Sequence, residues 1–232
     1  MKTYTLELIL KSSCLIGSGE GFGTLIDSDV VFDEIGIPYI PAKRIKGCLR
    51  DSAIEVCEMF DLANINLFGQ SAQKTKNPFE IVDFIFGKTG NAQPAQVYFS
   101  NLTIENYSDT IQWLKYFMDK DNEIINKNAI INQFAEIRQQ TSIDYEIGSA
   151  KEHSLRTIRV VKKGFLFKGT IDVIEEIESV PKILYFACSN LKRIGTKRNR
   201  GFGKVECKLY ENSTEINFLN ELERLCNQSS TV

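Results

Sequence analysis

The feature that most restricts the fold is a change of hydrophobic period early in the chain. From Thr3 to Lys11, apolar and polar residues alternate, and the members on one side are Tyr4, Leu6, Leu8 and Leu10. A period of two is typical of a strand with one buried face. From residue 42 to 60 the apolar residues instead recur every three or four positions, just after Pro41. This segment is therefore predicted to be an amphipathic helix.

The same reading along the chain predicts the remaining elements. Strands are expected over Val97–Thr103, Phe165–Val173 and Lys204–Tyr210, and helices over Thr110–Met118, Pro181–Gly195 and Ile216–Cys226. With insertions at about 62–95 and 104–160 set aside, the order is strand, helix, strand, strand, helix, strand. This order predicts an α+β fold with a ferredoxin-like (RRM-like) core, in which an antiparallel sheet carries helices on one face. No internal repeat is visible, so residues 1–232 are expected to form a single domain.

Composition excludes several classes of protein. The 232 residues, 43% of them apolar, are enough to bury a sizeable core, which excludes a disordered chain, a collagen and a disulfide mini-protein. The longest apolar run, Ile183–Cys188, is far shorter than the roughly 20 residues of a membrane span, and the start of the chain lacks a signal peptide. We expect a soluble, cytoplasmic protein without a membrane partner. Its six cysteines form no C-x-x-C pair and are expected to be reduced thiols.

Charge is strongly segregated, although the formal net charge is only −2. Segments 43–50, 151–168 and 192–204 hold 16 of the 28 Lys and Arg residues and a single acid, Glu152. A protein that binds a polyanion needs such local basic regions, and an acidic remainder limits indiscriminate binding elsewhere. The alternative is three unrelated solvated surface patches.

The last basic segment is also rich in glycine. It joins a predicted helix to a predicted strand and combines Gly195, Gly201 and Gly203 with six Lys and Arg residues. Glycines let backbone N–H groups approach phosphate closely, guanidinium groups supply paired donors, and Phe202 offers a surface for base stacking. The predicted helix start at residue 42 adds free N–H groups that favour an anion. A tight connection that needs glycine only for positive φ is the alternative for this loop.

Other chemistries find little support. The glycine-rich stretch 17–23 is not followed by a helix, and no phosphate-binding P-loop motif is present, so neither nicotinamide chemistry nor nucleotide hydrolysis is expected. The single histidine, His153, cannot build a Ser-His-Asp set or a zinc site by itself. Three acids, Asp27, Asp29 and Asp33, follow the glycine-rich stretch. Such a carboxylate either orients an attacking 2′-hydroxyl or holds Mg²⁺, or it only caps a turn.

Three groups of residues together resemble the RAMP superfamily, in particular the repeated backbone subunit of type III CRISPR effector complexes. The first runs from Gly17 to Arg50 and includes Gly23-Thr24-Leu25-Ile26-Asp27 and Pro38-Tyr39-Ile40-Pro41. The second contains Ile147-Gly148-Ser149-Ala150-Lys151, Leu155-Arg156-Thr157 and Gly164-Phe165-Leu166-Phe167. The third is the loop from Gly195 to Gly203. They span roughly half of the chain.

The resemblance implies a function and a set of site residues. Such a protein binds a guide CRISPR RNA along its RRM-like core, inserts a thumb-like hairpin between guide and complementary target RNA, and cleaves the target with a loop aspartate. Asp27 occupies the position of that aspartate, with Mg²⁺ as the cofactor expected for cleavage and metal ligands unknown. The implied RNA-binding residues are Lys43, Arg44, Lys46 and Arg50 at the helix start, Lys151, Arg156 and Arg159 in a thumb within 138–163, and Lys197, Arg198, Arg200, Gly201, Phe202 and Gly203 in the last loop.

The sequence departs from the family pattern at two places. Ala42-Lys43-Arg44 stands where Gly-Ser-Ser is usual, and Arg159 stands where an acid is common before the return strand of the thumb. Partners implied by the resemblance are other CRISPR effector subunits, in several copies or as paralogues side by side. Two alternatives stay open: a repeat-processing endonuclease of the same superfamily, and a catalytically inert RNA-binding subunit.

Overall fold

The structure is a computed structural model. It describes residues 1–17, 25–65, 78–88, 90, 94–120, 124–144, 146–175 and 177–229. The helices are α1 (Ala42–Leu62), α2 (Pro78–Phe86), α3 (Tyr107–Lys120), α4 (Lys127–Phe134), α5 (Ser179–Asn190) and α6 (Leu219–Ser229), with a 3₁₀ turn, η2, at Arg198–Arg200. The strands are β1 (Lys2–Leu10), β2 (Val97–Phe99), β3 (Thr103–Ile104), β4 (Ala135–Gln140), β5 (Arg156–Val161), β6 (Leu166–Val173), β7 (Val205–Glu211) and β8 (Thr214–Glu215). Within these ranges, no helix has both the length and the apolar character that a bilayer crossing requires.

The main sheet confirms the predicted topology. Its strand order is β2-β6-β1-β7-β8, and β3 also pairs with β6. All of these pairings are antiparallel, with Leu6 of β1 opposite Gly169 of β6 and Leu8 opposite Cys207 of β7. Without the insertions, β1, α1, β2, β6, α5 and β7 follow one another as strand, helix, strand, strand, helix, strand. This is the ferredoxin-like arrangement.

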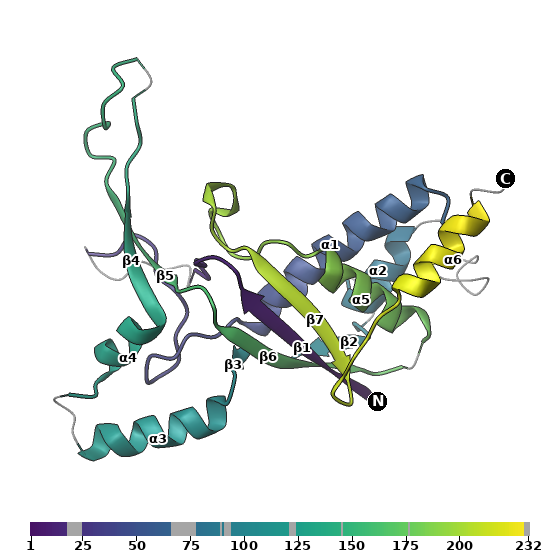
Figure 1. Ribbon diagram of the computed structural model, residues 1–232, viewed down its shortest axis with the longest axis horizontal. Helices are drawn as coiled ribbons and strands as arrows, with labels where there is room; N and C mark the ends of the chain where they lie inside the picture. Colours follow the sequence, from purple (N-terminus) through teal and green to yellow (C-terminus); the bar gives the residue numbers. More distant parts are fainter. Residues whose placement is uncertain are drawn as a thin grey trace.

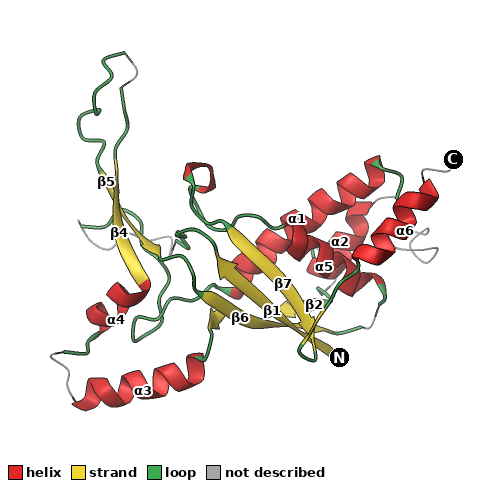
Figure 2. Ribbon diagram, viewed as in Figure 1, coloured by secondary structure: helices red, strands yellow, loops and turns green. Residues whose placement is uncertain are grey.

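The core lies between the sheet and the layer of α1, α2 and α5 (Figures 1 and 2). The predicted apolar side of β1 faces this layer, and Leu6 and Leu8 are fully buried. α1 contributes Ile45, Leu49 and Ala53, whose helical spacing keeps them on one face. The buried Ser52 hydroxyl of α1 donates a hydrogen bond of 2.8 Å to the Ala187 carbonyl oxygen, which joins α1 to α5.

The segment expected to be irregular, 62–95, contains a core element. Helix α2 buries Val82, Ile85 and Phe86, and the ring of Phe86 stacks on Phe99 of β2 with 6.2 Å between ring centroids. The Gly and Pro residues around α2 hid this short apolar pattern from the sequence reading. Residues 66–77 lie outside the described part of the chain.

Two other element boundaries differ from expectation. The strand predicted over Val97–Thr103 is split, because the Ser100 hydroxyl accepts the Thr170 N–H and Leu102 pairs with Ile40 instead of β6. The helix predicted to end at Gly195 ends at Asn190, because Leu191 takes an extended conformation. Residues 192–204 therefore form one loop between α5 and β7.

The second insertion, 104–160, holds α3, α4 and a two-stranded hairpin. β4 and β5 pair in antiparallel register, with Ala135 opposite Val161 and Gln140 opposite Arg156. The base of β5 is buried in the main core through Ile158, Val160 and Val161. From this base the hairpin extends away from the sheet (Figure 2). It occupies the region in which the thumb was predicted, 138–163, but begins at Ala135.

Gly203 closes the neck of the loop between α5 and β7. Its N–H donates to the Ser13 carbonyl oxygen, and its carbonyl oxygen accepts the Ile194 N–H, each at 2.9 Å. Its φ is +72°, and a Cβ atom would overlap the Ile194 carbonyl oxygen. Gly201 has a similar φ of +85°, but no atom lies within 4 Å of the position that a Cβ atom would take there. Both glycines thus have a left-handed backbone, but only at Gly203 would a side chain also overlap a neighbouring atom.

We expect Gly203→Ala to lower the free energy of unfolding by more than about 2 kcal/mol, because it adds overlap to the left-handed strain. Gly201→Ala should lower it by about 1 kcal/mol, since only the strain applies. Urea unfolding followed by circular dichroism measures both values. Equal decreases would show that the neck does not constrain residue 203.

Candidate nucleic-acid interface

The loop between α5 and β7 presents its arginines to solvent. Its neck is fixed by the Thr196 N–H, which donates to the Leu15 carbonyl oxygen at 3.1 Å. Beyond the neck, η2 is flanked by Lys197 and Gly201, both with left-handed backbone conformations. This geometry leaves Arg198 and Arg200 exposed on a short, tight turn. The turn suits multivalent contact with phosphate, as predicted for this loop.

The beginning of α1 lies next to the same turn. Lys43 is exposed, while Arg44 and Lys46 are half-buried, and burial lowers the pKa of Lys46. Burial raises the pKa of the neighbouring Cys48 thiol, and the positive charges of Arg198 and Arg44 oppose that shift. The charges of the start of α1 and of the η2 turn therefore act on the same thiol. The first amide of the helix, that of Ala42, donates to the Asn101 side-chain oxygen at 2.8 Å.

The outer end of the paired part of the hairpin also contacts the turn. The Lys197 Nζ atom donates to the Gln140 Oε1 atom at the end of β4, at 2.9 Å. Burial lowers the pKa of Lys197, the charges of Arg200 and Arg156 lower it further, and the charge of Asp27 opposes this shift. The η2 turn thus contacts the outer end of the paired part of the hairpin, and its charge acts on the same thiol as that of the start of α1. We call the cations of these three segments the basic face: Lys43, Arg44, Lys46, Arg156, Lys197, Arg198 and Arg200.

Several predicted RNA-binding residues lie outside the basic face. Arg50 is ion-paired with Asp83 of α2, with 2.7 Å between Nη2 and Oδ1. Lys151 stands beyond the paired part of the hairpin, where its N–H donates to the Ser142 carbonyl oxygen. Phe202 is half-buried against the core, and Gly203 serves the neck of the loop.

On the outer face of the sheet, the cations of the described strands are paired with acids. Its lysines are ion-paired with acids on the sheet or beside it, among them Lys168 with Glu7 at 2.8 Å and Lys208 with Glu215 at 3.0 Å. The central strand β1 turns Thr3, Thr5, Glu7 and Ile9 outward, none of them aromatic. The described aromatic residues of this face, Tyr98 and Tyr210, lie on the neighbouring strands β2 and β7. Many RRM domains stack RNA bases on aromatic side chains of this face. Positive charge here lies instead at one end of the sheet.

Asp27 lies on a loop that runs alongside β5. Its N–H donates to the Thr157 carbonyl oxygen at 2.8 Å, and Oδ2 accepts the Thr157 N–H at 2.7 Å. Oδ1 accepts the Arg156 Nη1 donor at 3.2 Å. The Thr157 amide, and then Arg156, hold the pKa of Asp27 below its ordinary value. Asp27 is therefore an ionised, solvent-accessible carboxylate at the edge of the basic face. The preceding residues 18–24, which include most of the glycine-rich stretch, lie outside the described part of the chain.

Asp29 is buried and forms an internal ion pair. Its Oδ2 atom lies 2.7 Å from Nη1 of Arg159, and the side chains are 11% and 15% exposed. The Arg159 guanidinium also lies over the Phe32 ring, 5.9 Å from the centroid. The structure thus places Arg159 inside the protein, where it holds the acidic loop. The Arg159 guanidinium, to which the resemblance gave an RNA-binding role, is thus engaged by Asp29 and Phe32.

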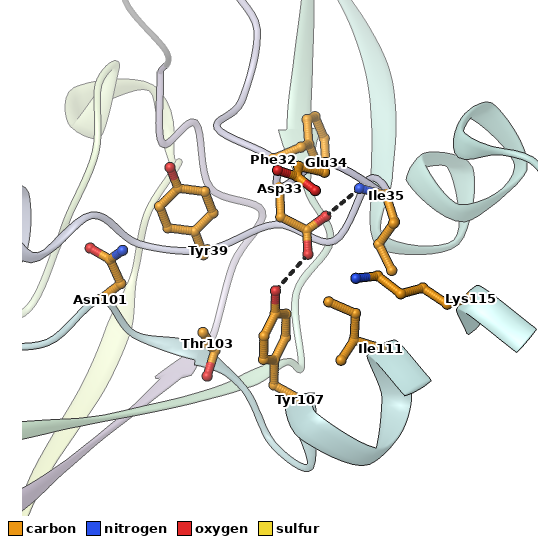
Figure 3. A pocket seen from close by; sticks show the side chains of 10 residues that line it. All are labelled: Phe32, Asp33, Glu34, Ile35, Tyr39, Asn101, Thr103, Tyr107, Ile111 and Lys115. Carbon is orange, nitrogen blue, oxygen red and sulfur yellow. Dashed lines mark hydrogen bonds between the residues drawn. The ribbon is translucent and has the colours of Figure 1, made fainter. Parts of the chain in front are cut away.

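Asp33 caps a turn, the structural role considered for these acids. Its Oδ1 atom accepts the N–H groups of Ile35, Gly36 and Ile37 at 2.8–3.0 Å. Oδ2 accepts the Tyr107 hydroxyl at 2.9 Å, and burial together with Asp33 raises the pKa of Tyr107 to about 12. These groups border a pocket of about 520 Å³ between the 32–39 loop and α3 (Figure 3). None of its lining residues belongs to the basic face.

Sequence reasoning missed two contacts that build the site. Thr157 contributes only backbone atoms to Asp27, so its side chain carried no signal. Gln140 meets Lys197 across 57 positions of sequence, a distance at which a neutral polar residue has no recognisable pattern.

We expect Arg159→Ala to lower the free energy of unfolding by about 3 kcal/mol, because it removes the guanidinium partner of a buried carboxylate. Arg138→Ala is the matched control on the same hairpin. Its pair with Glu136 is 54% and 33% exposed, so the decrease should stay below about 1 kcal/mol. Chemical denaturation of the two variants tests this, and equally small effects would contradict the role given to Arg159.

A comparison with curated protein sequences found no significant match. Among solved structures, a chain of the Type III-B Cmr-beta complex bound to cognate target RNA, determined by cryo-EM, superposes with a TM-score of 0.61 and 13% identity. The alignment covers 90% of this chain and 97% of the other. A chain of Type III-B Cmr-beta in the apo state gives a TM-score of 0.60 and 13% identity, over 91% and 98% of the two chains. The model of the RAMP superfamily matches residues 7–206, and the protein therefore belongs to the RAMP superfamily.

Proposed function

We propose that this protein is a guide-RNA-binding backbone subunit of a type III CRISPR interference complex, in which it also cleaves bound target RNA. One observation carries the proposal: cations from three distant segments of sequence form a single basic face. Lys197 contacts Gln140 of the hairpin, and the charges of Arg198 and Arg44 both act on the Cys48 thiol. Membership of the RAMP superfamily and the fold shared with chains of Cmr-beta complexes support it.

The basic face suits a single-stranded ribose-phosphate chain. Phosphate contacts release counterions, and arginines supply paired donors to phosphate oxygens. Arg198 and Arg200 would provide such contacts from the η2 turn, while Lys43, Arg44 and Lys46 would provide them at the start of α1. Each segment is held by a different part of the core, so the spacing between contacts is set before RNA binds. The hairpin then stands beside the strand, as a thumb between guide and target would.

Asp27 is the group that we assign to target cleavage. In this proposal its carboxylate orients the 2′-hydroxyl that attacks the adjacent phosphorus, at the edge of the basic face where that phosphate would lie. As the new O–P bond forms, the hydroxyl proton passes to water and the P–O5′ bond breaks. The 5′-oxygen leaves with a proton from water, and a 2′,3′-cyclic phosphate remains. A bound Mg²⁺ would neutralise charge on the phosphate. Among the described residues no three His, Cys, Asp or Glu side chains are grouped as a metal cage. Asp27 would thus supply one ligand, with RNA phosphate and water supplying the others.

Asp27→Ala is expected to abolish cleavage of target RNA while guide binding and assembly persist, because Asp27 lies at the edge of the basic face. Single-turnover cleavage with Mg²⁺ present and then chelated measures the effect on activity, and copurified guide RNA measures assembly. Because the pKa of Asp27 is lowered, its ionised form is complete above about pH 5 and disappears only as the pH falls through that lowered value. Asp27 therefore should not cause a fall in cleavage rate between about pH 8 and 5.

Equal cutting by wild type and Asp27→Ala would remove Asp27 from the mechanism. A wild-type complex that binds guide and target but does not cut would favour the inert subunit. One observation favours that alternative: both carboxylate oxygens of Asp27 already accept hydrogen bonds from residues of β5. A repeat-processing enzyme would instead cut free repeat RNA as a monomer or dimer.

Replacing Lys197, Arg198 and Arg200 together by alanine should weaken RNA binding and flatten its salt dependence. For single strands, the slope of log K against log salt falls by about 0.7 for each phosphate that the protein no longer neutralises. Filter binding or fluorescence anisotropy over a range of salt concentrations measures it. Lys208→Ala, which removes a cation from the sheet face, is the control and should leave the slope unchanged. If the triple variant had the same slope of log K against log salt as wild type, the contacts assigned to the turn would be refuted.

A further inference from the structure

Asp27 and Asp29 both pair with arginines of β5, but in different surroundings. The outer pair, Asp27 with Arg156, spans 3.2 Å, and its side chains are 38% and 66% exposed. The inner pair, Asp29 with Arg159, spans 2.7 Å and is almost completely buried. Water and dissolved ions reach only the outer pair. An exposed pair of this kind contributes little stability and exchanges readily, whereas a buried pair is broken only at a large cost.

The position of the acidic loop does not depend on the outer pair. Backbone hydrogen bonds join the Asp27 N–H to the Thr157 carbonyl oxygen and the Arg159 N–H to the Ser28 carbonyl oxygen, at 2.8 and 3.0 Å. The inner ion pair adds a side-chain contact to the same segment. Arg156 can therefore leave Asp27 while the carboxylate stays in place, held at Oδ2 by the Thr157 amide.

Arg156 also stands among other cations. Its charge and that of Arg200 both act on Lys197, so these three groups share the part of the basic face next to Asp27. In the free protein, Asp27 is the carboxylate that neutralises the Arg156 guanidinium. A phosphate bound to the basic face would offer Arg156 a competing anion with paired acceptor oxygens.

A divalent cation and Arg156 compete for the same oxygen. Two cations on Oδ1 of Asp27 would repel each other, so a metal ion gains affinity when the guanidinium moves away. We propose that Arg156 is an exchangeable cap on Asp27, which bound RNA withdraws by offering a phosphate, so that the carboxylate binds a divalent cation more tightly when RNA is present. This inference rests on the proposed function, in which Asp27 acts at the RNA backbone. Arg156 is accordingly a positioning residue that regulates Asp27.

Binding of Mn²⁺ to the full-length protein tests the cap without any cleavage reaction. Mn²⁺ accepts the same oxygen ligands as Mg²⁺, and free Mn²⁺ is counted by electron paramagnetic resonance. Without RNA, Arg156→Ala should bind Mn²⁺ about tenfold more tightly than wild type, the effect of removing one positive charge about 5 Å from a divalent ion in water. Arg156→Lys should retain most of the cap. Asp27→Asn in the Arg156→Ala background should remove the gain.

Two further measurements separate the cap from general electrostatics. Arg138→Ala removes the same charge from the same hairpin and should leave Mn²⁺ affinity within about twofold, because long-range charge effects are screened. A non-cleavable RNA with 2′-deoxy positions should strengthen Mn²⁺ binding by a larger factor in wild type than in Arg156→Ala, since only wild type has a cap to withdraw. Equal factors in the two proteins, or equal Mn²⁺ affinities without RNA, would overturn the inference.

The cap and the proposed function fail in different ways. If Asp27→Ala still cleaves target RNA while Mn²⁺ binding depends on Arg156, the cap stands and the catalytic assignment falls. If Asp27→Ala is inactive while Mn²⁺ binding ignores Arg156, the catalytic assignment stands and the cap falls.

Discussion

The base of β5 is the constraint on which the candidate site depends. On one side Val161 exchanges two backbone hydrogen bonds with Cys14, at 2.8 and 2.9 Å, and on the other Ile158 pairs in parallel with Ser28. Ile158, Val160 and Val161 are completely buried, so this part of the hairpin belongs to the core although it lies within an insertion. The first residues of the strand, Arg156 and Thr157, are exposed or half-buried just beyond it. Core packing thus determines where the groups that contact Asp27 are placed.

The protein has a basic face although its formal net charge is −2. The outer face of the sheet pairs its lysines with glutamates, as Lys11 does with Glu206 and Lys208 with Glu215. Such pairs neutralise the charge there and leave hydrated, low-affinity surface. At the end of the sheet the lysines and arginines of the η2 turn and of the start of α1 lie together, with few acids between them. In the proposed function, this distribution would direct a polyanion toward this end, while the acidic remainder of the chain would oppose binding elsewhere.

The sequence predicted those parts of the structure that are encoded locally. β1, α1 and β6 each carry a long, regular apolar pattern, and their order was enough to indicate the ferredoxin-like core. α2 was missed because its apolar residues occupy only about two turns in a stretch rich in Gly and Pro. The end of α5 was placed too late because Leu191 and Ile194 continue the apolar spacing, although they are buried as parts of a loop. In both cases a short apolar pattern did not indicate whether its residues would be buried in a helix or in a loop.

The sequence likewise indicated only part of the candidate site. Grouping of Lys and Arg in three segments predicted a common basic surface, since charge clusters are visible in a linear sequence. The sequence did not show which of these cations are paired inside the protein, because Arg50 and Arg159 contact acids 33 and 130 positions away. A pairing at that separation is defined only after the hairpin has packed. Sequence analysis thus identified the charged segments but not their internal partners.

Arg159 illustrates why one of these partners matters for register. The structure pairs it with Asp29, two residues after Asp27. Residues two apart on an extended segment point to the same side, so both acids face β5 together. A shift of the loop by one residue would turn both carboxylates away and leave the Arg159 guanidinium buried without Asp29. The buried pair therefore selects the one register in which Asp27 reaches the basic face, and the exposed Arg156 is free to exchange without disturbing that register.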